Sequence, residues 1–381
     1  MNIVVLRETQ KGEARVALMP ESVKKLVALK ASVLVESGAG LSAARTDEEF
    51  KDAGAAISTD RAKLLSDADV LAVVNRPSTE DFQQLRNGTV VIGFLRALDE
   101  PAALTPAVSA GLTTFAVELI PRITRAQAMD ALSSMATVAG YKAVLIGASY
   151  IPRMFPLLMT AAGTVPPARV LVLGAGVAGL QAIATARRLG AVVEGYDVRA
   201  AAGEQVKSLG ATFLEVDLGG IKTEDAGGYA VELSDEAMNR GRALIAEHAK
   251  TTDVLITTAQ VPGRRAPLLI TEEAVNGMKR GSVIIDLAGS TGGNCALSKA
   301  DEVVERNGVT ILAPTNLPAT VPVHASQLYS RNITSFLTLL IKDGQLQIDM
   351  NDDVVGPSCV THGGEVVNQR VAAALNAPIS G

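Results

Sequence analysis

The sequence contains few cysteines and histidines, and this scarcity limits the chemistry it can perform. Cys295 and Cys359 are the two cysteines among 381 residues, and they form no CxxC pattern. This usage favours free thiols in a reducing compartment over a disulfide framework, and no metal site is predicted. The three histidines, His248, His324 and His362, all follow residue 247. We expect each to be a surface or structural residue rather than a catalytic base.

Concentrated positive charge and long apolar runs are absent as well. The 35 basic and 40 acidic residues are scattered, without the basic stripe that marks a nucleic-acid-binding protein. The first ten residues, MNIVVLRETQ, place charges directly after a short apolar run, unlike a signal peptide. The longest uncharged stretch, 309–330, contains three prolines, which a membrane-spanning helix disfavours. We expect a protein that is soluble on its own, without direct membrane insertion.

Short runs rich in Val and Ile alternate with helical patterns along the chain. Such runs predict buried parallel strands, and the alternation predicts helices on both faces of a sheet. Thr46 and Glu49 have capping-box spacing, which predicts a helix that ends at Gly54. The predicted strands form two series, 2–6, 32–37, 69–74 and 89–95, then 169–174, 192–197, 254–259, 282–288 and 308–314.

The interruption between the two series, an irregular stretch around residues 153–168, indicates two domains. After Pro314 the pattern predicts a long helix and then a polar hairpin, which we expect to return to the first domain. The predicted fold is α/β, with two Rossmann-like, doubly wound parallel-sheet domains and a cleft between them. The first domain is discontinuous and comprises 1–137 and 321–381, and the second comprises 138–320.

The segment RVLVLGAGVAGLQ carries a nucleotide-binding fingerprint. Gly174, Gly176 and Gly179 form GxGxxG between a predicted strand and a helix, and Asp197 ends the next strand. These glycines permit a tight turn, close approach of a pyrophosphate and close helix–strand packing. Asp197 would bind the adenosine ribose and repel a 2′-phosphate, so NAD(H) is favoured over NADP(H). Arg199 is a complication, because a nearby arginine could accept that phosphate.

Three stretches together identify a family. They are GEARVALMP (12–20), RITRAQAMDALSS (122–134) and TAAGTVPPARVLVLGAGVAGLQAIATARRLGA (160–191), supported by SVIIDLAGSTGGNC (282–295). Over nearly its whole length the chain resembles the NAD(H)-binding domain I of proton-translocating nicotinamide nucleotide transhydrogenase. It is most similar to the short soluble alpha subunit that occurs where this enzyme is divided among separate chains.

Alanine dehydrogenase, which shares this fold, is the alternative. The resemblance implies that an alanine dehydrogenase would carry Lys, His and Asp where this chain has Asn75, Arg96 and Ser290. All three catalytic residues of the alternative are therefore missing. The resemblance implies that Arg15 would bind a substrate carboxylate in alanine dehydrogenase, but transhydrogenases share this arginine. A structural ion pair or a cap near a helix start is the favoured interpretation here.

The resemblance also implies roles for four residues of the segment 122–134. Gln127 would hold the nicotinamide side of NADH, Asp130 and Ser133 would hydrogen-bond the carboxamide, and Arg122 would steady this loop. We expect Gln127, Asp130 and Ser133 to share one face of a single helix, since they are spaced at i, i+3 and i+6. Without the resemblance, helix capping and solvation would be the favoured interpretation.

Further nucleotide contacts are expected around the fingerprint and in a loop. The resemblance implies that residues 226–241, with Tyr229, form a mobile loop that closes over bound nucleotide. A surface loop that leads into a helix is an equally favoured interpretation. The complete predicted nucleotide-binding set is Gly174, Gly176, Val177, Ala178, Gly179, Asp197, Val198, Arg199, Tyr229, Thr258 and Ala259.

The missing acid–base residues fit the implied reaction. Oxidation of an alcohol or amine requires a general base, whereas hydride transfer between two nicotinamide rings requires positioning and a dry site. The resemblance implies that NADH donates a hydride to NADP⁺ on a partner subunit, with proton coupling in membrane-embedded subunits. It also implies a homodimer, with the C-terminal hairpin as a candidate contact, in the cytoplasm and peripheral on the inner membrane face. A nucleotide sensor without chemistry is the non-enzyme alternative.

Overall fold

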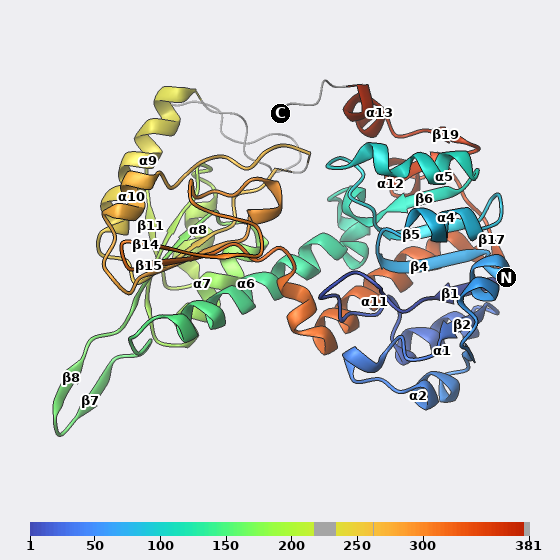
Figure 1. The fold of residues 1–381 in the computed structure, drawn as a ribbon, viewed down its shortest axis with the longest axis horizontal. Coiled ribbons are helices and arrows are strands. Elements are labelled where there is room, and N and C mark those ends of the chain that lie inside the picture. Colours follow the sequence, from blue (N-terminus) through green and yellow to red (C-terminus); the bar gives the residue numbers. More distant parts are fainter. Residues whose placement is uncertain (217–233, 262, 377–381) are drawn as a thin grey trace. The chain divides into compact units, whose positions relative to one another are not determined.

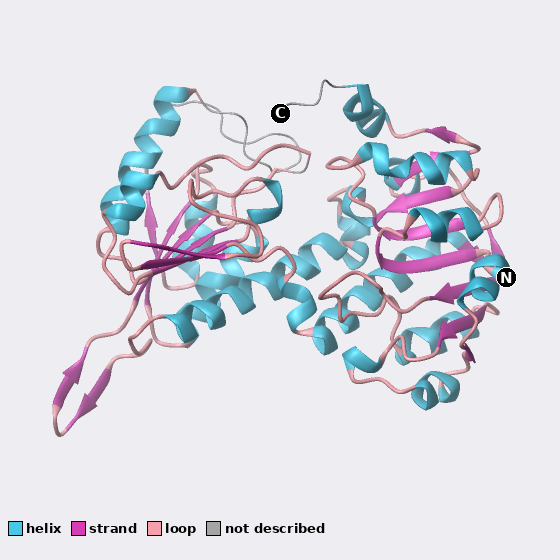
Figure 2. Ribbon diagram, in the orientation of Figure 1, coloured by secondary structure: helices cyan, strands magenta, loops and turns pink. Residues whose placement is uncertain are grey.

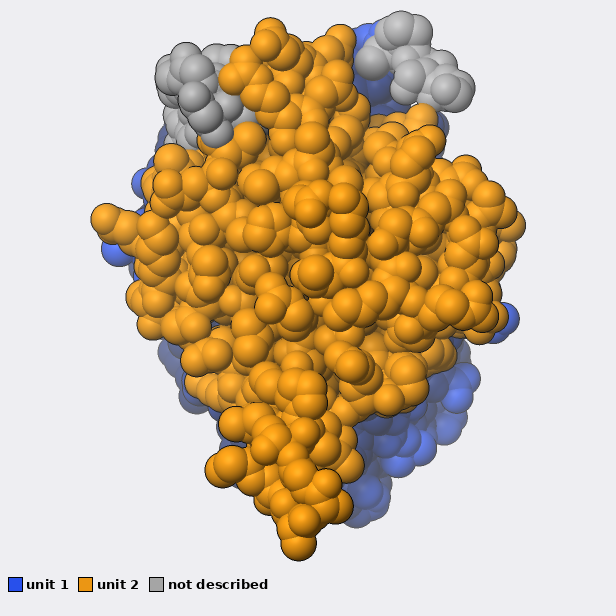
Figure 3. Space-filling view, turned by 90° about the vertical axis from the view of Figure 1, so that its left-hand side faces the viewer, with its two compact units in different colours: residues 1–135, 318–381 blue, residues 136–317 orange. Residues whose placement is uncertain are grey.

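The structure is a computed structural model that describes residues 1–216, 234–261 and 263–376. It divides the chain into two compact units, coloured separately in Figure 3. Unit 1 comprises Met1–Met135 and Pro318–Gly381, and unit 2 comprises Ala136–Leu317. The boundaries therefore fall after residues 135 and 317, whereas the sequence predicted them after residues 137 and 320.

An eight-stranded sheet forms the centre of unit 1 (Figures 1 and 2). Its strands, in spatial order, are β19 (Glu365–Val366), β18 (Cys359–His362), β6 (Thr113–Ala116), β5 (Val90–Phe94), β4 (Val70–Asn75), β1 (Asn2–Val5), β2 (Ser32–Glu36) and β3 (Ala56–Ser58). From β6 to β3 all neighbours are parallel, whereas β18 pairs antiparallel with β6 and β19. The C-terminal segment therefore extends the sheet that the N-terminal segment begins.

Helices cover both faces of this sheet. They are α1 (Pro20–Ala28), α2 (Asp47–Asp52), α3 (Arg61–Asp67), α4 (Thr79–Gln84), α5 (Thr105–Ser109), α11 (Pro322–Leu340), α12 (Val355–Ser358) and α13 (Gln369–Asn376). Helices α3, α4, α5 and α13 share one core with alternate strand residues such as Ala116. The neighbouring Phe115 makes an edge contact with Phe336 of α11, so α11 packs on the opposite face. Helix α2 begins with the predicted capping box of Thr46 and Glu49.

A seven-stranded sheet forms the centre of unit 2. In spatial order its strands are β11 (Thr212–Leu214), β10 (Val192–Tyr196), β9 (Arg169–Leu173), β12 (Val254–Thr257), β13 (Val283–Asp286), β15 (Val309–Leu312) and β14 (Val303–Arg306). Its helices are α6 (Ala131–Tyr150), which begins in unit 1, α7 (Val177–Arg188), α8 (Ala202–Ser208), α9 (Asp235–Ala249) and α10 (Glu272–Asn276). Val170 and Val172 of β9 pack with α6, α7 and α8, while Leu171 and Leu173 pack with α9 and α10. The sheet is therefore doubly wound.

The predicted fold class is confirmed: both sheets are mainly parallel, with helices on both faces. The antiparallel strands β14, β18 and β19 were not predicted. The stretch expected to be irregular contains a hairpin of β7 (Leu158–Thr160) and β8 (Gly163–Val165), which projects from the body of unit 2 (Figure 1). The polar hairpin expected after α11 is present as β16 (Ile341–Lys342) and β17 (Gln345–Leu346).

Helix α6 is long and apolar enough to cross a membrane by length and composition. No membrane-spanning stretch was expected from the sequence, because the longest uncharged stretch, 309–330, contains three prolines. Of the most apolar window of α6, 39% is buried within the structure. Core helices of soluble proteins have the same composition, and Val138, Ala143 and Val144 of α6 are buried.

Candidate nucleotide-binding site

A glycine-rich turn joins β9 to α7 at the carboxyl edge of the unit 2 sheet. Gly174 has a φ of +95°, and a Cβ there would lie 2.6 Å from Thr258 Oγ1. A Cβ on Gly179 would lie 1.7 Å from the Gly174 carbonyl oxygen, so only glycine allows this approach of helix and strand. A Cβ on Gly176 would meet nothing within 4 Å, so this side of the turn has open space. The turn thus has the geometry that the fingerprint predicts.

The first turn of α7 supplies hydrogen-bond donors at this edge. Gly176 is the N-cap residue of α7, and no side-chain hydrogen bond caps this end of the helix. The amides of Val177 and Ala178 belong to the first turn, where a helix has no acceptors of its own. Together with the partial positive charge of the helix N-terminus, they suit a phosphate group.

Gly140 of α6, which sequence reasoning did not single out, lets α6 approach this turn. A Cβ on Gly140 would lie 2.1 Å from the Ala178 carbonyl oxygen and 2.9 Å from its carbonyl carbon. Both contacts are with backbone atoms, so no side-chain movement could relieve them. A glycine in the middle of an apolar helix was the available sequence signal, because it usually has a packing reason.

Asp197 and Arg199 form a closed ion pair beside the turn. Asp197 accepts hydrogen bonds from the Ala175 amide (2.7 Å) and from the Arg199 amide and Nε (both 2.9 Å), and Arg199 Nη2 lies 2.8 Å from its second oxygen. The Asp197 side chain is 7% exposed. Asp197 thus follows β10, as predicted, and Arg199 covers its carboxylate. Val198 lies between them.

Thr258 and Ala259 follow β12 and contact the same turn. The Thr258 hydroxyl lies 3.1 Å from the Gly174 carbonyl oxygen. Ala259 donates to Asn294 Oδ1 (3.1 Å), and Asn294 Nδ2 donates back to the Ala259 carbonyl (2.9 Å). The loop that follows β12 is therefore held by an amide from the loop that follows β13.

Asp286, at the end of β13, organises that second loop. Its fully buried carboxylate accepts from the amides of Asn294 (2.8 Å) and Cys295 (3.0 Å) and from the hydroxyls of Thr257 (2.8 Å) and Ser298 (2.5 Å). Such a satisfied carboxylate fixes backbone geometry. Asp286 and Asn294 lie in the quoted segment 282–295, but sequence reasoning did not single them out, because their partners are backbone groups and distant hydroxyls.

The segment 122–134 lies in unit 1 and is not one helix, so that expectation was wrong. A 3₁₀ helix, η4, spans Thr124–Met129, and α6 starts at Ala131. Between them Asp130 caps α6, since its Oδ1 accepts from the Ser133 amide (2.8 Å) and its Oδ2 from the Ser133 hydroxyl (2.6 Å). An aspartate that bonds the amide three residues later favours a helix start over a helix interior. The capping interpretation is therefore correct for Asp130.

Arg122, Asp130 and Ser133 still meet, by way of this cap. Arg122 Nη2 lies 3.4 Å from the Ser133 hydroxyl oxygen, which itself donates to Asp130. Gln127 is exposed on η4. The four residues thus belong to one short stretch, anchored by the buried side chains of Ala126 and Met129.

Arg15 is the residue that the resemblance implies would bind a substrate carboxylate in alanine dehydrogenase. Here it is bound by Glu13 of the same chain. Glu13 lies 2.8 Å from Arg15 Nε and 2.6 Å from Arg15 Nη2, and Asn75 Nδ2 donates to Glu13 (2.9 Å) and Glu8 (3.2 Å). Burial opposes ionisation of Glu13, but the hydrogen bonds and charge of Arg15 prevail and lower its pKa to about 2. The ion pair expected for Arg15 is confirmed. Arg96 pairs with Glu100 (2.8 Å).

Two histidines have structural partners, as expected. His248 Nδ1 lies 3.1 Å from Glu194 Oε2, and His362 Nδ1 lies 3.0 Å from the Thr113 hydroxyl. Both cysteines are buried and unpaired. Across 1–216, 234–261 and 263–376, no group of three or more His, Cys, Asp or Glu could hold a metal ion. Tyr229 and half of the expected lid, residues 226–233, lie outside the described residues, and residues 235–241 form the start of α9.

Comparison with known proteins agrees with this arrangement. The N-terminal domain model of the "Alanine dehydrogenase/PNT" family matches residues 4–139, and its C-terminal domain model matches 143–369. The chain is 48% identical over 376 residues to an NAD(P) transhydrogenase alpha subunit of Rhodospirillum rubrum, covering 97% of this chain and 98% of that protein.

Solved structures give the same result. The crystal structure of transhydrogenase from Sinorhizobium meliloti has 46% sequence identity and a TM-score of 0.88, covering 96% of this chain and 100% of that one. An L-alanine dehydrogenase structure is more distant, at 26% identity and a TM-score of 0.83, with coverage of 98% and 99%. The chain therefore belongs to the alanine dehydrogenase/PNT family and, within this NAD(H)-binding family, is an NAD(P) transhydrogenase alpha subunit.

Proposed function

We propose that the chain binds NADH and presents it for direct hydride transfer to NADP⁺ on a partner subunit. Proton translocation would be coupled in membrane-embedded partner subunits, through which this chain would be peripheral on the inner face of the cell membrane. The observation that carries the proposal is the combination of an open glycine turn in unit 2 with an Arg15 that Glu13 already binds. A nucleotide would find open space at the glycine turn. A small amino-acid substrate would have to displace the Glu13 carboxylate from Arg15.

In this proposal the glycine turn and the first turn of α7 bind the pyrophosphate, and Asp197 binds the adenosine ribose. The ribose hydroxyls would compete with Arg199 for Asp197, so Arg199 would turn away on binding. Val198, Thr258 and Ala259 would border the nucleotide. Asp130 and Ser133 would orient the carboxamide, supported by Arg122, and Gln127 would hold the nicotinamide side.

The test is hydride transfer from NADH to an NADP⁺ analogue after the chain is mixed with a separately purified NADP(H)-binding partner. Transfer without any added acid or base cofactor is the expected result, because no proton moves at the reacting carbons. Robust turnover with alanine or pyruvate would contradict the proposal. Binding of NADH without transfer in the mixture would favour a nucleotide sensor.

A Gln127→Asn variant separates positioning from binding. The Gln127 side chain is exposed, so we expect normal folding and nearly unchanged NADH affinity. The shorter side chain should slow hydride transfer by about tenfold or more, since misplacement by about 1 Å is costly. Stopped-flow measurement of a single turnover checks this, and an unchanged rate would refute the positioning role.

We further propose a homodimer in which the exposed apolar surface around the end of α6 and the β7–β8 hairpin contacts a second copy. The residues of this surface and their exposed fractions are Tyr150 (48%), Met154 (55%), Leu157 (52%), Met159 (80%) and Val165 (40%). A two-stranded hairpin is marginally stable without packing on either face, so a partner surface would stabilise it. This surface is the contact we propose, in place of the C-terminal hairpin that was the candidate from the sequence.

A further inference from the structure

The 3₁₀ helix η4, which carries Gln127, is held in place by residues from the C-terminal part of unit 1. It spans six residues, Thr124–Met129, and its N-cap makes no side-chain hydrogen bond. Runs of 3₁₀ helix longer than about four residues are uncommon, because their hydrogen bonds have poorer geometry than those of an α-helix. The position of η4 therefore depends on contacts with other elements more than on its own hydrogen bonds.

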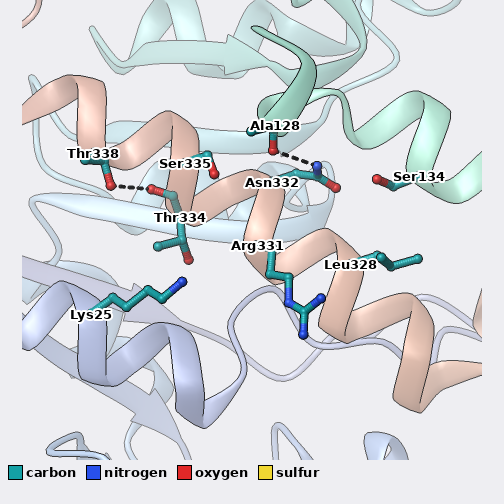
Figure 4. A pocket seen from close by; sticks show the side chains of 9 residues that line it. All are labelled: Lys25, Ala128, Ser134, Leu328, Arg331, Asn332, Thr334, Ser335 and Thr338. Atoms are coloured by element: carbon teal, nitrogen blue, oxygen red, sulfur yellow. Dashed lines mark hydrogen bonds between the residues drawn. The ribbon is translucent and has the colours of Figure 1, made fainter. Parts of the chain in front are cut away.

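The end of η4 is fixed against α11. Asn332 Nδ2 of α11 donates to the Ala128 carbonyl oxygen (2.9 Å), and Figure 4 shows this side chain reaching from α11 to the backbone of η4. Asn332 is 7% exposed, and the side chains of Ala126 and Met129 are buried as well. The backbone at residue 128 is thus one anchored point of η4.

The start of η4 is tied to a different part of the C-terminal segment, the loop before α12. Arg125 Nη2 lies 2.7 Å from Asp352 Oδ1 and also donates to Asp353 Oδ1, 227 and 228 positions further along the chain. The hydrogen bond from Arg125 lowers the pKa of Asp352 below its ordinary value of 3.8, so the pair is charged at neutral pH. The Arg125 side chain is 45% exposed, and ion pairs at such exposure contribute little to stability. The tie therefore matters for the position of η4 rather than for the free energy of unfolding.

Asp352 is itself held in a fixed place. The Asp352 Oδ1 atom that Arg125 contacts also accepts from the amides of Val354 (2.8 Å) and Val355 (3.1 Å) at the start of α12. Both valines are buried, and α12 packs against β6 and β18 of the central sheet. An exposed arginine ordinarily samples many rotamers, but one that is bonded to such a carboxylate has a defined end point. Arg125 therefore connects η4 to the sheet of unit 1.

We propose that Arg125 is a positioning residue for hydride transfer, because its tie to the loop before α12 determines where η4 places Gln127. The inference rests on the proposed function, in which Gln127 holds the nicotinamide side of NADH. Gln127 lies between the two anchored points of η4, Arg125 and Ala128. Release of the Arg125 tie leaves one anchor, about which the start of η4 can turn and carry Gln127 out of place. Since transfer is sensitive to a misplacement of about 1 Å, loss of the tie slows transfer without weakening the nucleotide contacts of unit 2.

Single-turnover hydride transfer from NADH, in the mixture of the full chain with the NADP(H)-binding partner, tests the inference. Arg125→Gln should slow transfer about fivefold or more, while the Kd for NADH stays within about twofold and the thermal midpoint is unchanged. Arg125→Lys keeps the charge and should retain most of the rate. Arg86→Gln is the matched control, because it removes another exposed ion pair of unit 1, with Asp69 (2.9 Å), and it should behave as the wild type does.

A double-mutant cycle distinguishes positioning through the tie from a local defect at Arg125. Asp352→Ser combined with Asp353→Ala removes both carboxylates, while the serine hydroxyl can still accept from the amides at the start of α12. This variant should slow transfer as much as Arg125→Gln does, and addition of Arg125→Gln to it should cause no further loss.

Three results would overturn the inference: an unchanged rate in Arg125→Gln, additive losses in the cycle, or an equal loss in Arg86→Gln. No transfer by the wild-type chain would instead overturn the proposed function, and this inference with it. The wild-type measurement therefore separates the failure of one from the failure of the other.

Discussion

At the level of single residues, two neighbouring buried carboxyl groups respond to pH in opposite ways. Burial raises the pKa of Glu8 from its ordinary value of 4.5 to about 7, against the hydrogen bonds from Val74 and Asn75, and the charge of Glu13 raises it further. Glu13 is ionised far below that pH because Arg15 lies against it. Asn75 donates to both carboxyl groups. The chain thus holds one proton and one negative charge in this cluster at mildly acidic pH.

Glu8→Gln should make the free energy of unfolding less dependent on pH. Because the folded-state pKa of Glu8 is raised, the folded protein holds this proton between pH 4.5 and about 7 while the unfolded chain releases it. Stability from this group is therefore present below pH 4.5 and lost as pH rises through 7. The variant should match the wild type near pH 4 and exceed it by up to about 3 kcal/mol at pH 8. Chemical denaturation across this range measures the difference.

Glu13→Gln is the control for that experiment and should act with the opposite sign. The pKa of Glu13 is lowered, so its contribution is present above pH 4.5 and lost as pH falls through about 2. Its replacement should destabilise the protein at neutral pH. A Glu8→Gln variant that loses stability equally at pH 5 and pH 8 would contradict the titration of Glu8.

At the level of elements, the close contact between α6 and α7 supports the proposed phosphate-binding turn. Alanine at an ordinary helix interior is more stable than glycine by about 1 kcal/mol. At Gly140 the added methyl would meet the backbone of Ala178 at 2.1 Å. Overpacking against backbone costs about 1–3 kcal/mol, so the steric effect should exceed the helix propensity.

Gly140→Ala should therefore lower the thermal midpoint and raise the Kd for NADH several-fold, since α7 would have to shift. Gly277→Ala is the matched control, because its nearest neighbour to an added Cβ lies at 3.5 Å. Thermal unfolding and fluorescence titration with NADH measure the two effects. Equal behaviour of the two variants would show that the α6–α7 contact does not support the turn.

Elements also differ in how far the sequence predicted them. The glycine turn was predictable because each glycine has a local reason in the chain. The break at Asp130 was not predictable, because the spacing of Gln127, Asp130 and Ser133 fits a continuous helix. In the structure the Asp130 side chain bonds the Ser133 amide and starts a new helix there. The β7–β8 hairpin was missed because its strands have three residues each and exposed apolar side chains, without the alternation of a half-buried strand.

At the level of the whole molecule, the proposed homodimer depends on surface rather than on core residues. Met159→Asp should convert the dimer into a monomer, since it places a charge in a contact that would be dry. Because Met159 is 80% exposed, the fold of the chain itself should be unaffected. Leu41→Asp, at a 63% exposed position in unit 1, is the control.

Sedimentation velocity of both variants decides between the outcomes. Retention of the dimer by Met159→Asp, or a monomeric wild type at micromolar concentration, would exclude this surface as the dimer contact. Loss of the dimer in both variants would indicate general destabilisation instead.

The pairing of Arg15 with Glu13 has a consequence for the crowded mixture of metabolites in which such a subunit works. Glu13 is tethered two residues from Arg15, so a free organic acid would have to compete with a carboxylate held at the guanidinium by that short tether. Pyruvate or alanine would have to compete with a carboxylate that never diffuses away. Under the proposed function, this internal pairing would keep Arg15 from binding free carboxylates without a gate to exclude them.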